Sequence, residues 1–315
     1  MVPVPRELGM NINRVEYIEH KPVMVDDVLS LVKDLDPGCF IDATFGSGGH
    51  SSAIKSTYPK FHIIGIDRDT ESVENNIFDI EVYKYNFSDI DELVKKKEIA
   101  NIRCILFDFG ISNHQITKIE RGFTFEKNSI LDMRMDREQE LTAKSFLNDS
   151  SLSELTLIIK EYGEDRHSGR IAKEIINSRP IDTSHQLSEA ISRAVPENNP
   201  VVKKKSVRRC FQAIRIYVND ELRHIERGVI KSIDLLASQG LIITISYHSL
   251  EDKIVKEIFS KFSQACVCSP KIPECVCDKK PILSLGKPRK IKPKENEISK
   301  NRKSKSAILR FAIKL

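Results

Sequence analysis

The sequence predicts an α/β fold built on a doubly wound parallel sheet, Rossmann-like in its order, with an all-helical unit inserted into it. Three observations indicate this. Short apolar runs alternate with helical patterns from residue 23 to residue 108, which is typical of a parallel sheet covered by helices. Strand signals are then few between residues 114 and 210. The pattern of strand and helix resumes after residue 211.

The first third of the chain alternates helix and strand, element by element. Helical periodicity predicts helices over residues 23–35, 71–78 and 91–97. Buried strands are expected at residues 39–41, 62–66, 82–87 and 103–107. Because consecutive strands are separated by helices, they are expected to run parallel, with a ligand beyond their carboxyl ends.

The most informative stretch follows the first strand. Residues 42–50 read Asp-Ala-Thr-Phe-Gly-Ser-Gly-Gly-His, and Gly46, Gly48 and Gly49 allow a tight turn that a ligand can approach closely. His50 can begin a helix whose first N–H groups face that ligand. The stretch is typical of a nucleotide-binding loop, and a glycine-rich turn without a ligand is the alternative.

Asp67 favours the interpretation as a cofactor site. It ends the second strand, 18 residues after Gly49, where a nucleotide-binding unit places the carboxylate that holds the ribose hydroxyls. The dinucleotide fingerprint requires Gly or Ala where this chain has Ser51, so NAD fits poorly. A ligand with a ribose and no pyrophosphate fits better, and S-adenosylmethionine is the commonest such cofactor.

The middle of the chain is predicted to be a helical insertion domain, residues 114–210, between two parts of the sheet domain, residues 1–113 and 211–315. Its clearest helices cover residues 152–162, 168–177 and 184–194. After it, one long helix or two are expected over residues 211–238, followed by a buried strand at 240–245 and a final strand at 307–313.

The composition is that of a globular protein in a reducing compartment. The 315 residues are 40% hydrophobic and 30% charged, enough for one large domain or two moderate ones. No apolar run approaches the roughly 18 residues of a membrane span, and residues 1–13 lack a signal-peptide pattern. Seven cysteines are expected to be reduced thiols. We therefore expect a cytoplasmic protein with no membrane partner.

The net charge of +5 conceals an asymmetry. Residues 278–315 contain 13 Lys and Arg against 3 Asp and Glu, a local charge of +10, so the remaining residues sum to −5. A basic tail on a slightly acidic body suggests a polyanionic partner, most often a nucleic acid. A solvated tail is the alternative, which charge alone does not exclude.

Several short strings occur in an order that resembles a known family. They are His20–Met24 (HKPVM), Asp42–His50, Leu106–Ser112 (LFDFGIS), Arg121–Phe125 (RGFTF), Leu131–Asp136 (LDMRMD), Phe211–Ile216 (FQAIRI), Val218–Leu222 (VNDEL), Ser246–Asp252 (SYHSLED) and Ser306–Arg310 (SAILR). Together they resemble the MraW/RsmH family, the bacterial 16S ribosomal RNA (cytosine-N4)-methyltransferases, over nearly the whole chain.

The resemblance implies an S-adenosylmethionine-dependent enzyme with a helical insertion. Its implied substrate is the N4 amino group of a cytidine in the decoding centre of 16S ribosomal RNA, so the small ribosomal subunit is the expected partner, and a homodimer is a possible assembly. The implied cofactor contacts are Gly48, Gly49, His50, Asp67, Phe87, Asp108 and Gln115. Carboxylates accept hydrogen bonds from ribose hydroxyls or an ammonium, and Phe87 is expected to flank the adenine.

The chain departs from the family locally. Asn113-His114 stand where the family usually has Ser-Pro, and Tyr247 where it commonly has Phe. The tail segment 301–307 lacks the family's Pro and has Lys for its second Arg. Because Arg and Lys bind phosphate differently, the departures bear on RNA binding more than on the cofactor site.

The sequence offers more than one candidate for the catalytic residues. A cytosine N4 amine is a poor nucleophile because its lone pair is delocalised into the ring. Asp108 can accept its N–H bonds in addition to its implied cofactor role, and His248 is a candidate proton acceptor. The alternative for His248 is a structural place at a helix start, beside Ser249 as an N-cap with Asp252 three positions later.

The target base is expected to be unpaired and stacked on an aromatic ring. Phe123, Phe125 and Tyr247 are candidates, and packing in the core is the alternative for both phenylalanines. The basic residues Lys203–Lys205 and Arg208-Arg209 contact phosphates or form a solvated helix face.

Four cysteines, Cys266, Cys268, Cys275 and Cys277, form a C-x-C-x₆-C-x-C pattern before the basic tail. Clustered thiols can bind zinc. C-x-C is a less usual chelate than C-x₂-C, and the family implies no metal. We therefore predict no metal and keep zinc as the alternative.

Two other functions stay open at this point. One is an amino-methyltransferase acting on DNA, protein or a small molecule, against which the strings at 121–125 and 246–252 argue. The other is a non-catalytic RNA-binding module that retains a cofactor pocket, against which the intact glycine loop, Asp67 and Asp108 argue.

Overall fold

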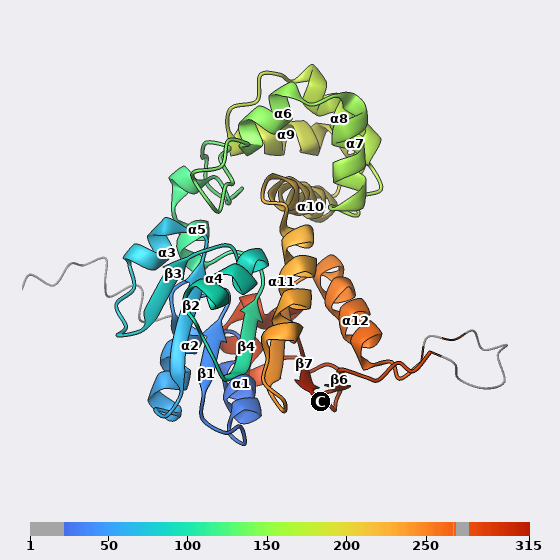
Figure 1. Ribbon diagram of the computed structural model, residues 1–315. Helices are drawn as coiled ribbons and strands as arrows, with labels where there is room; N and C mark the ends of the chain where they lie inside the picture. The colour runs from blue at the N-terminus through green and yellow to red at the C-terminus, as the bar shows by residue number, and fades with distance from the viewer. Residues whose placement is uncertain (1–21, 267, 269–276) are drawn as a thin grey trace, which may run out of the picture.

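A computed structural model describes residues 22–266, 268 and 277–315. His20 and Lys21 of the first family string, and Cys275, lie outside the described residues. Figure 1 shows a domain built around a sheet, with a set of helices above it that belongs to the middle of the chain. We call these the sheet domain and the helical insertion.

The sheet has seven strands in the order β3-β2-β1-β4-β5-β7-β6. The strands are β1 (Cys39–Asp42), β2 (His62–Asp67), β3 (Glu81–Lys84), β4 (Ile102–Asp108), β5 (Leu241–Ser246), β6 (Leu283–Leu285) and β7 (Ile308–Lys314). The first five strands are parallel, and β7 pairs antiparallel with β5 and β6. The predicted α/β sheet is confirmed, and its order reverses beside β1, which places a crevice at the carboxyl ends of β1 and β4.

Helices cover both faces of this sheet because neighbouring strand residues point to opposite sides. Phe40 packs on one face with α1 (Val25–Val32) and α2 (Gly49–Thr57). Ile41 packs on the other face with helices from both halves of the chain. Those helices are α4 (Ile90–Lys96), α11 (Glu221–Leu235) and α12 (Ser249–Ser263).

Three expected elements of the first half are shorter than predicted. The helix expected over residues 23–35 is α1. The helix expected over residues 71–78 is α3 (Thr70–Glu74). The third strand ends at Lys84, before Phe87, because the Asn86 side chain accepts a hydrogen bond from the Ser88 N–H at 3.0 Å and starts a 3₁₀ turn, Phe87–Asp89. Phe87 therefore lies in a turn beyond the carboxyl end of β3 and not within a strand.

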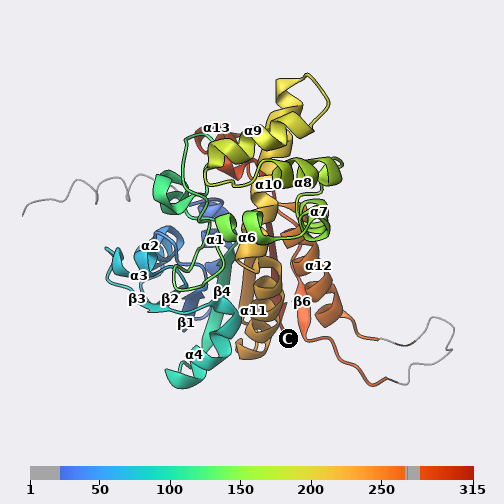
Figure 2. The same ribbon diagram turned by 90° about the horizontal axis from the view of Figure 1, so that it is seen from above.

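The helical insertion has a hydrophobic core of its own. It contains α6 (Ala143–Asp149), α7 (Leu152–Glu161), α8 (Ser168–Asn177), α9 (Ser184–Ala194) and α10 (Pro200–Val218). α7 and α8 lie side by side in both views (Figures 1 and 2). No strand of the sheet lies between Asp108 and Leu241, a stretch that the structure describes throughout.

Local signals in the sequence set the ends of these helices. Thr142 and Thr183 begin α6 and α9 as reciprocal capping boxes. The boundary predicted at residue 210 falls inside α10, whose residues as far as Val218 pack in the insertion core. The segment 211–238 holds the end of α10 and all of α11, which are separated where Asp220 adopts the left-handed conformation with φ 47°.

The short elements near the chain end return to the sheet domain. α13 (Glu295–Lys300) is followed by a 3₁₀ turn, Arg302–Ser306, and then by β7. Glu297 accepts a hydrogen bond from the Met24 N–H at 2.6 Å, which ties α13 to the start of α1. Across the described ranges, no helix combines the length and the apolar character that crossing a bilayer demands.

Candidate active site

A cleft of about 1140 Å³ opens at the carboxyl ends of the central strands. Pockets for one small molecule measure roughly 300–1,000 Å³, so this cleft has room for more than one ligand group. Its walls come from the glycine loop, the ends of β2, β4 and β5, one side of α10 and the 3₁₀ turn of the tail. The predicted site residues that line it are Gly49, His50, Asp67, Phe87, Asp108, Gln115 and His248.

Buried polar contacts fix the glycine loop to the sheet. Asp42 ends β1 and is buried, and the Ser51 hydroxyl of α2 donates to its carboxylate at 2.7 Å. The Thr44 hydroxyl accepts a hydrogen bond from the Asp108 N–H at 2.6 Å. The loop is thus held to both β1 and β4 before any ligand binds.

The glycines of the loop have different tasks. Gly46, at φ 53°, lines the cleft. Gly48, at φ 73°, is absent from the lining, and a Cβ there would lie 2.6 Å from Phe45 and 2.8 Å from Phe78. Gly48 therefore permits the left-handed turn and its packing at the start of α2, and Gly46 is the residue that leaves the wall open.

Asp67 stands at the end of β2 and faces the loop. Its carboxylate accepts hydrogen bonds from the Gly46 N–H at 2.7 Å and the Asp69 N–H at 2.8 Å. Burial raises the pKa of Asp67 to about 6, against the lowering effect of these two N–H groups. A ligand hydroxyl that donates to this carboxylate would stabilise its ionised form.

Asp108 is the last residue of β4 and lies at the centre of a second cluster of polar side chains. The Tyr247 hydroxyl donates to its Oδ1 at 2.7 Å. His50 Nδ1 lies 3.8 Å from its Oδ2, while His50 Nε2 donates to the Val23 carbonyl at 3.0 Å. Burial raises the pKa of Asp108 to about 6, although His50 and Tyr247 lower it. Asp108 is thus a carboxylate able to exchange a proton near neutral pH.

Phe87 is held in place by packing. Its ring meets Phe107 edge to face, with centroids 5.5 Å apart at 83°. A Cβ at Gly228 of α11 would lie 2.6 Å from Phe87, so that glycine leaves the ring its room. The ring lines the cleft beside Asp67, where it can flank a planar base.

Gln115 lines the cleft within a network that the sequence did not reveal. It lies in α5 (Asn113–Thr117), and its amide Nε2 donates to Asp69 at 2.7 Å. Arg121 is fully buried and holds the same carboxylate with two hydrogen bonds, at 3.2 and 2.8 Å. Arg121 also donates to the Arg134 and Met135 carbonyls, both at 3.1 Å.

Glu71 extends this network to the surface. His114 Nε2 lies 2.6 Å from its carboxylate and Lys118 Nζ 3.0 Å. Burial raises the pKa of Glu71, but the hydrogen bonds from Lys118 and His114 outweigh it and hold the value at about 2. The strings at 121–125 and 131–136 are therefore joined to the loop that follows Asp67.

His248 begins α12 as its N-cap. Its Nδ1 accepts a hydrogen bond from the Glu251 N–H at 3.4 Å, and its Nε2 lies 2.9 Å from the Glu251 carboxylate. The Glu251 side chain accepts in return from the Tyr247 and His248 N–H groups. The cap lies one residue earlier than the Ser249 and Asp252 pair of the sequence alternative, and both His248 nitrogens face Glu251.

The structure places the three aromatic candidates for base stacking in two different environments. Tyr247 lines the cleft. Phe123 is buried in the insertion core, and Phe125 packs against it and meets the Phe211 ring edge to face, with centroids 5.5 Å apart. Tyr247 is therefore the ring of the three that can contact a base in the cleft.

Basic side chains from α10 and from the tail also line the cleft. Arg208 comes from α10, and Arg302, Lys303 and Lys305 come from the 3₁₀ turn of the tail. Burial lowers the pKa of Lys303. The sequence assigns positive charge to the whole tail, and the structure brings this short turn, in which Ser304 is buried, to the cleft.

Comparison with known proteins agrees with this arrangement. The profile of the MraW methylase family matches residues 17–315. A ribosomal RNA small subunit methyltransferase H from Caldicellulosiruptor bescii is 44% identical over 307 residues, covering 94% of this chain and 99% of the relative. The enzyme of that name from Halothermothrix orenii is 42% identical over 305 residues, covering 94% and 98%.

Solved structures are more distant. A Streptococcus mutans protein described as a candidate methyltransferase, in complex with SAH, is 10% identical with a TM-score of 0.41, covering 94% of this chain and 99% of that one. Such a likeness is too remote to add to the assignment, which rests on the sequence matches. The chain belongs to the MraW methylase family and is an S-adenosylmethionine-dependent methyltransferase.

Proposed function

We propose that this enzyme methylates the N4 amino group of a cytidine in the decoding centre of 16S ribosomal RNA, within or on the way to the small ribosomal subunit. The relatives' shared name, ribosomal RNA small subunit methyltransferase H, supports the substrate class. The observation that carries the proposal is one cleft lined by a glycine loop, by the carboxylates of Asp67 and Asp108, and by basic side chains of α10 and the tail. We expect the enzyme in the cytoplasm, where ribosomal subunits are assembled.

The residues present fit S-adenosylmethionine. Gly46 leaves the loop wall open, and Asp67 presents a carboxylate at the end of β2, where ribose hydroxyls are held in nucleotide-binding sheets. Phe87 offers a ring for the adenine. When bound, this cofactor supplies an electrophilic methyl group on a sulfonium.

Asp108 is our candidate to accept the proton that the amine must lose. With the cofactor bound, transfer of its methyl group to N4 would leave the electron pair of the broken carbon–sulfur bond on sulfur and one N–H proton to be lost. Asp108 lies in the cleft with a pKa raised to about 6 by burial, so it is mostly ionised at pH 7 and able to accept that proton. His248 is a weaker candidate because both its nitrogens face Glu251.

Tyr247 and the basic residues complete the proposed RNA site. The Tyr247 hydroxyl holds Asp108, so its ring is fixed at the place where a flipped base would meet the carboxylate. Arg208, Arg302 and Lys305 offer positive charge for the phosphates on either side of that nucleotide.

Purified protein tests the proposal directly. The full chain is incubated with isotope-labelled S-adenosylmethionine and, in separate reactions, unmethylated small subunits, naked 16S RNA, double-stranded DNA or free cytidine. Labelled nucleosides are then separated after digestion. We expect N4-methylcytidine from at least one of the two ribosomal substrates. Label in DNA alone, or label at another atom of the RNA, would contradict the substrate or the position.

A further inference from the structure

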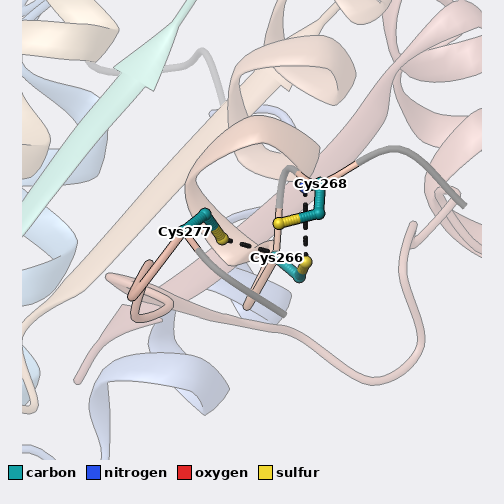
Figure 3. A group of neighbouring side chains, drawn as sticks. All are labelled: Cys266, Cys268 and Cys277. Carbon is teal, nitrogen blue, oxygen red and sulfur yellow. Dashed lines mark hydrogen bonds between the residues drawn. The ribbon is translucent and has the colours of Figure 1, made fainter. Parts of the chain in front are cut away.

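Three thiols converge far from the cleft, where the chain leaves α12. Cys266 and Cys268 follow that helix, and Cys277 precedes β6. Figure 3 shows their side chains turned toward one another, and their sulfur atoms all lie within 4.8 Å of each other. None of the three lines the cleft.

The two chain segments that carry these thiols are fixed to the same helix end. The Ile282 N–H donates to the Phe262 carbonyl at 2.8 Å. The Lys279 ammonium donates to the Lys261 carbonyl at 2.9 Å. One backbone and one side-chain hydrogen bond outside the cysteines themselves therefore hold the Cys277 segment against the helix that leads to Cys266.

The spacing of the sulfurs suits a tetrahedral metal ion. Zinc binds thiolate sulfur at about 2.3 Å, so two sulfurs on one tetrahedral ion are about 3.8 Å apart. The Cys266 and Cys277 sulfurs lie 3.8 Å apart, well beyond the roughly 2.05 Å of a disulfide. The Cys268 N–H donates to the Cys266 sulfur at 3.3 Å, and hydrogen bonds to the ligating atoms are typical of metal sites.

These thiols differ from the buried cysteines of the core. Burial raises the pKa of the Cys39 thiol to about 12 and that of Cys104 well above its usual range, so both stay protonated. Cys266 is exposed and Cys268 and Cys277 are half-buried.

We propose that Cys266, Cys268 and Cys277 bind one zinc ion. Three soft thiolates select zinc over magnesium or calcium, which prefer oxygen ligands. The ion would join the end of α12 to the segment that returns to β6, and β6 pairs with β7 at the edge of the sheet. Its role would be structural, because the sulfurs lie outside the cleft.

The full chain, purified under a non-metal reductant, tests this site. Elemental analysis is expected to find one zinc per chain. Titration of metal-free protein with cobalt is expected to give the sulfur-to-cobalt charge-transfer band and the intense visible bands of a tetrahedral site. Each of Cys266→Ser, Cys268→Ser and Cys277→Ser is expected to weaken zinc binding at least about tenfold in competition with a chromogenic chelator.

Ser263→Ala, at the end of α12, is the matched control and is expected to keep wild-type zinc affinity. The cobalt spectrum is measured on the wild-type chain, so the test does not depend on the variants folding. A wild-type chain that takes up neither zinc nor cobalt, or a cobalt complex without the thiolate band, would overturn the proposal.

Discussion

Two carboxylates, at the ends of the two strands that flank β1, give the cleft its chemistry. Asp67 and Asp108 each have a pKa raised to about 6, mainly by burial. Asp67 is already engaged by two backbone N–H groups of its own chain, and Asp108 by Tyr247. Asp67 is thus suited to hold a ligand, and Asp108 to accept a proton.

Replacing Asp67 by Ala is expected to weaken binding of S-adenosylmethionine by about 1.5–3 kcal/mol, the range for a hydrogen bond to a charged group. Titration calorimetry measures the affinity. Asp34→Ala changes an exposed acid that follows α1 and does not line the cleft, so this control is expected to bind as the wild type does. Unchanged affinity in Asp67→Ala would remove that residue from the cofactor site.

Cofactor affinity is expected to fall as pH drops below about 6. In the free protein the pKa values of Asp67 and Asp108 lie near 6, above the ordinary value, so acid protonates both. A cofactor with ribose hydroxyls and positive charge favours the ionised forms, so binding releases protons. Calorimetry at pH 6 in buffers of different ionisation enthalpy should detect this release, and at pH 8 it should be much smaller. Equal proton exchange at both pH values would contradict the assignment.

At the scale of elements, the loop after β2 is held by a buried ion pair. Asp69 and Arg121 are both almost fully buried, and Gln115 shares the same carboxylate. The glycine loop and Asp67 could be predicted from sequence because their spacing is local. Arg121 could not be assigned to this ion pair from the sequence, because its partner is 52 residues away and no periodic pattern indicates a contact at that separation.

Arg121→Met is expected to destabilise the protein by about 3–5 kcal/mol, because it leaves the Asp69 charge buried without its partner. Urea unfolding followed by circular dichroism measures the change. Arg166→Met removes an exposed ion pair with Glu197 in the same part of the chain and should cost about 1 kcal/mol or less. If Arg121→Met lowered the free energy of unfolding as little as this control does, the buried pair would be shown to contribute little.

At the scale of the molecule, the sequence predicted six of the seven strands but neither the short β6 nor how the halves meet. The long apolar strands β4 and β5 were expected nearly as observed, and so were α8 and α9. Phe123 and Phe125 show the limit of such reasoning. An aromatic residue near a motif can line a site or fill a core, and only the tertiary packing distinguishes the two.

The 3₁₀ turn of the tail is expected to position RNA and leave the cofactor site intact. Replacing Arg302, Lys303 and Lys305 together by Ala should weaken RNA binding and reduce the slope of log affinity against log salt by roughly two to three, as fewer counterions are released. The matched control replaces the exposed Lys287, Lys290 and Lys292, which carry the same charge outside the cleft.

Fluorescence anisotropy with a fragment of 16S RNA over a salt series measures both variants, and calorimetry checks cofactor affinity. Equal loss of RNA binding in the two variants would mean that the tail acts by charge alone, irrespective of the cleft.

Nucleoside mass spectrometry of small-subunit RNA tests the central claim most directly. RNA is compared from cells with the gene, cells without it, and cells without it that carry either the wild-type chain or Asp108→Asn. We predict that N4-methylation of one decoding-centre cytidine is present in the first, absent in the second, restored by the wild-type chain and strongly reduced with Asp108→Asn. An unchanged level of that methylated cytidine in cells without the gene would contradict the account.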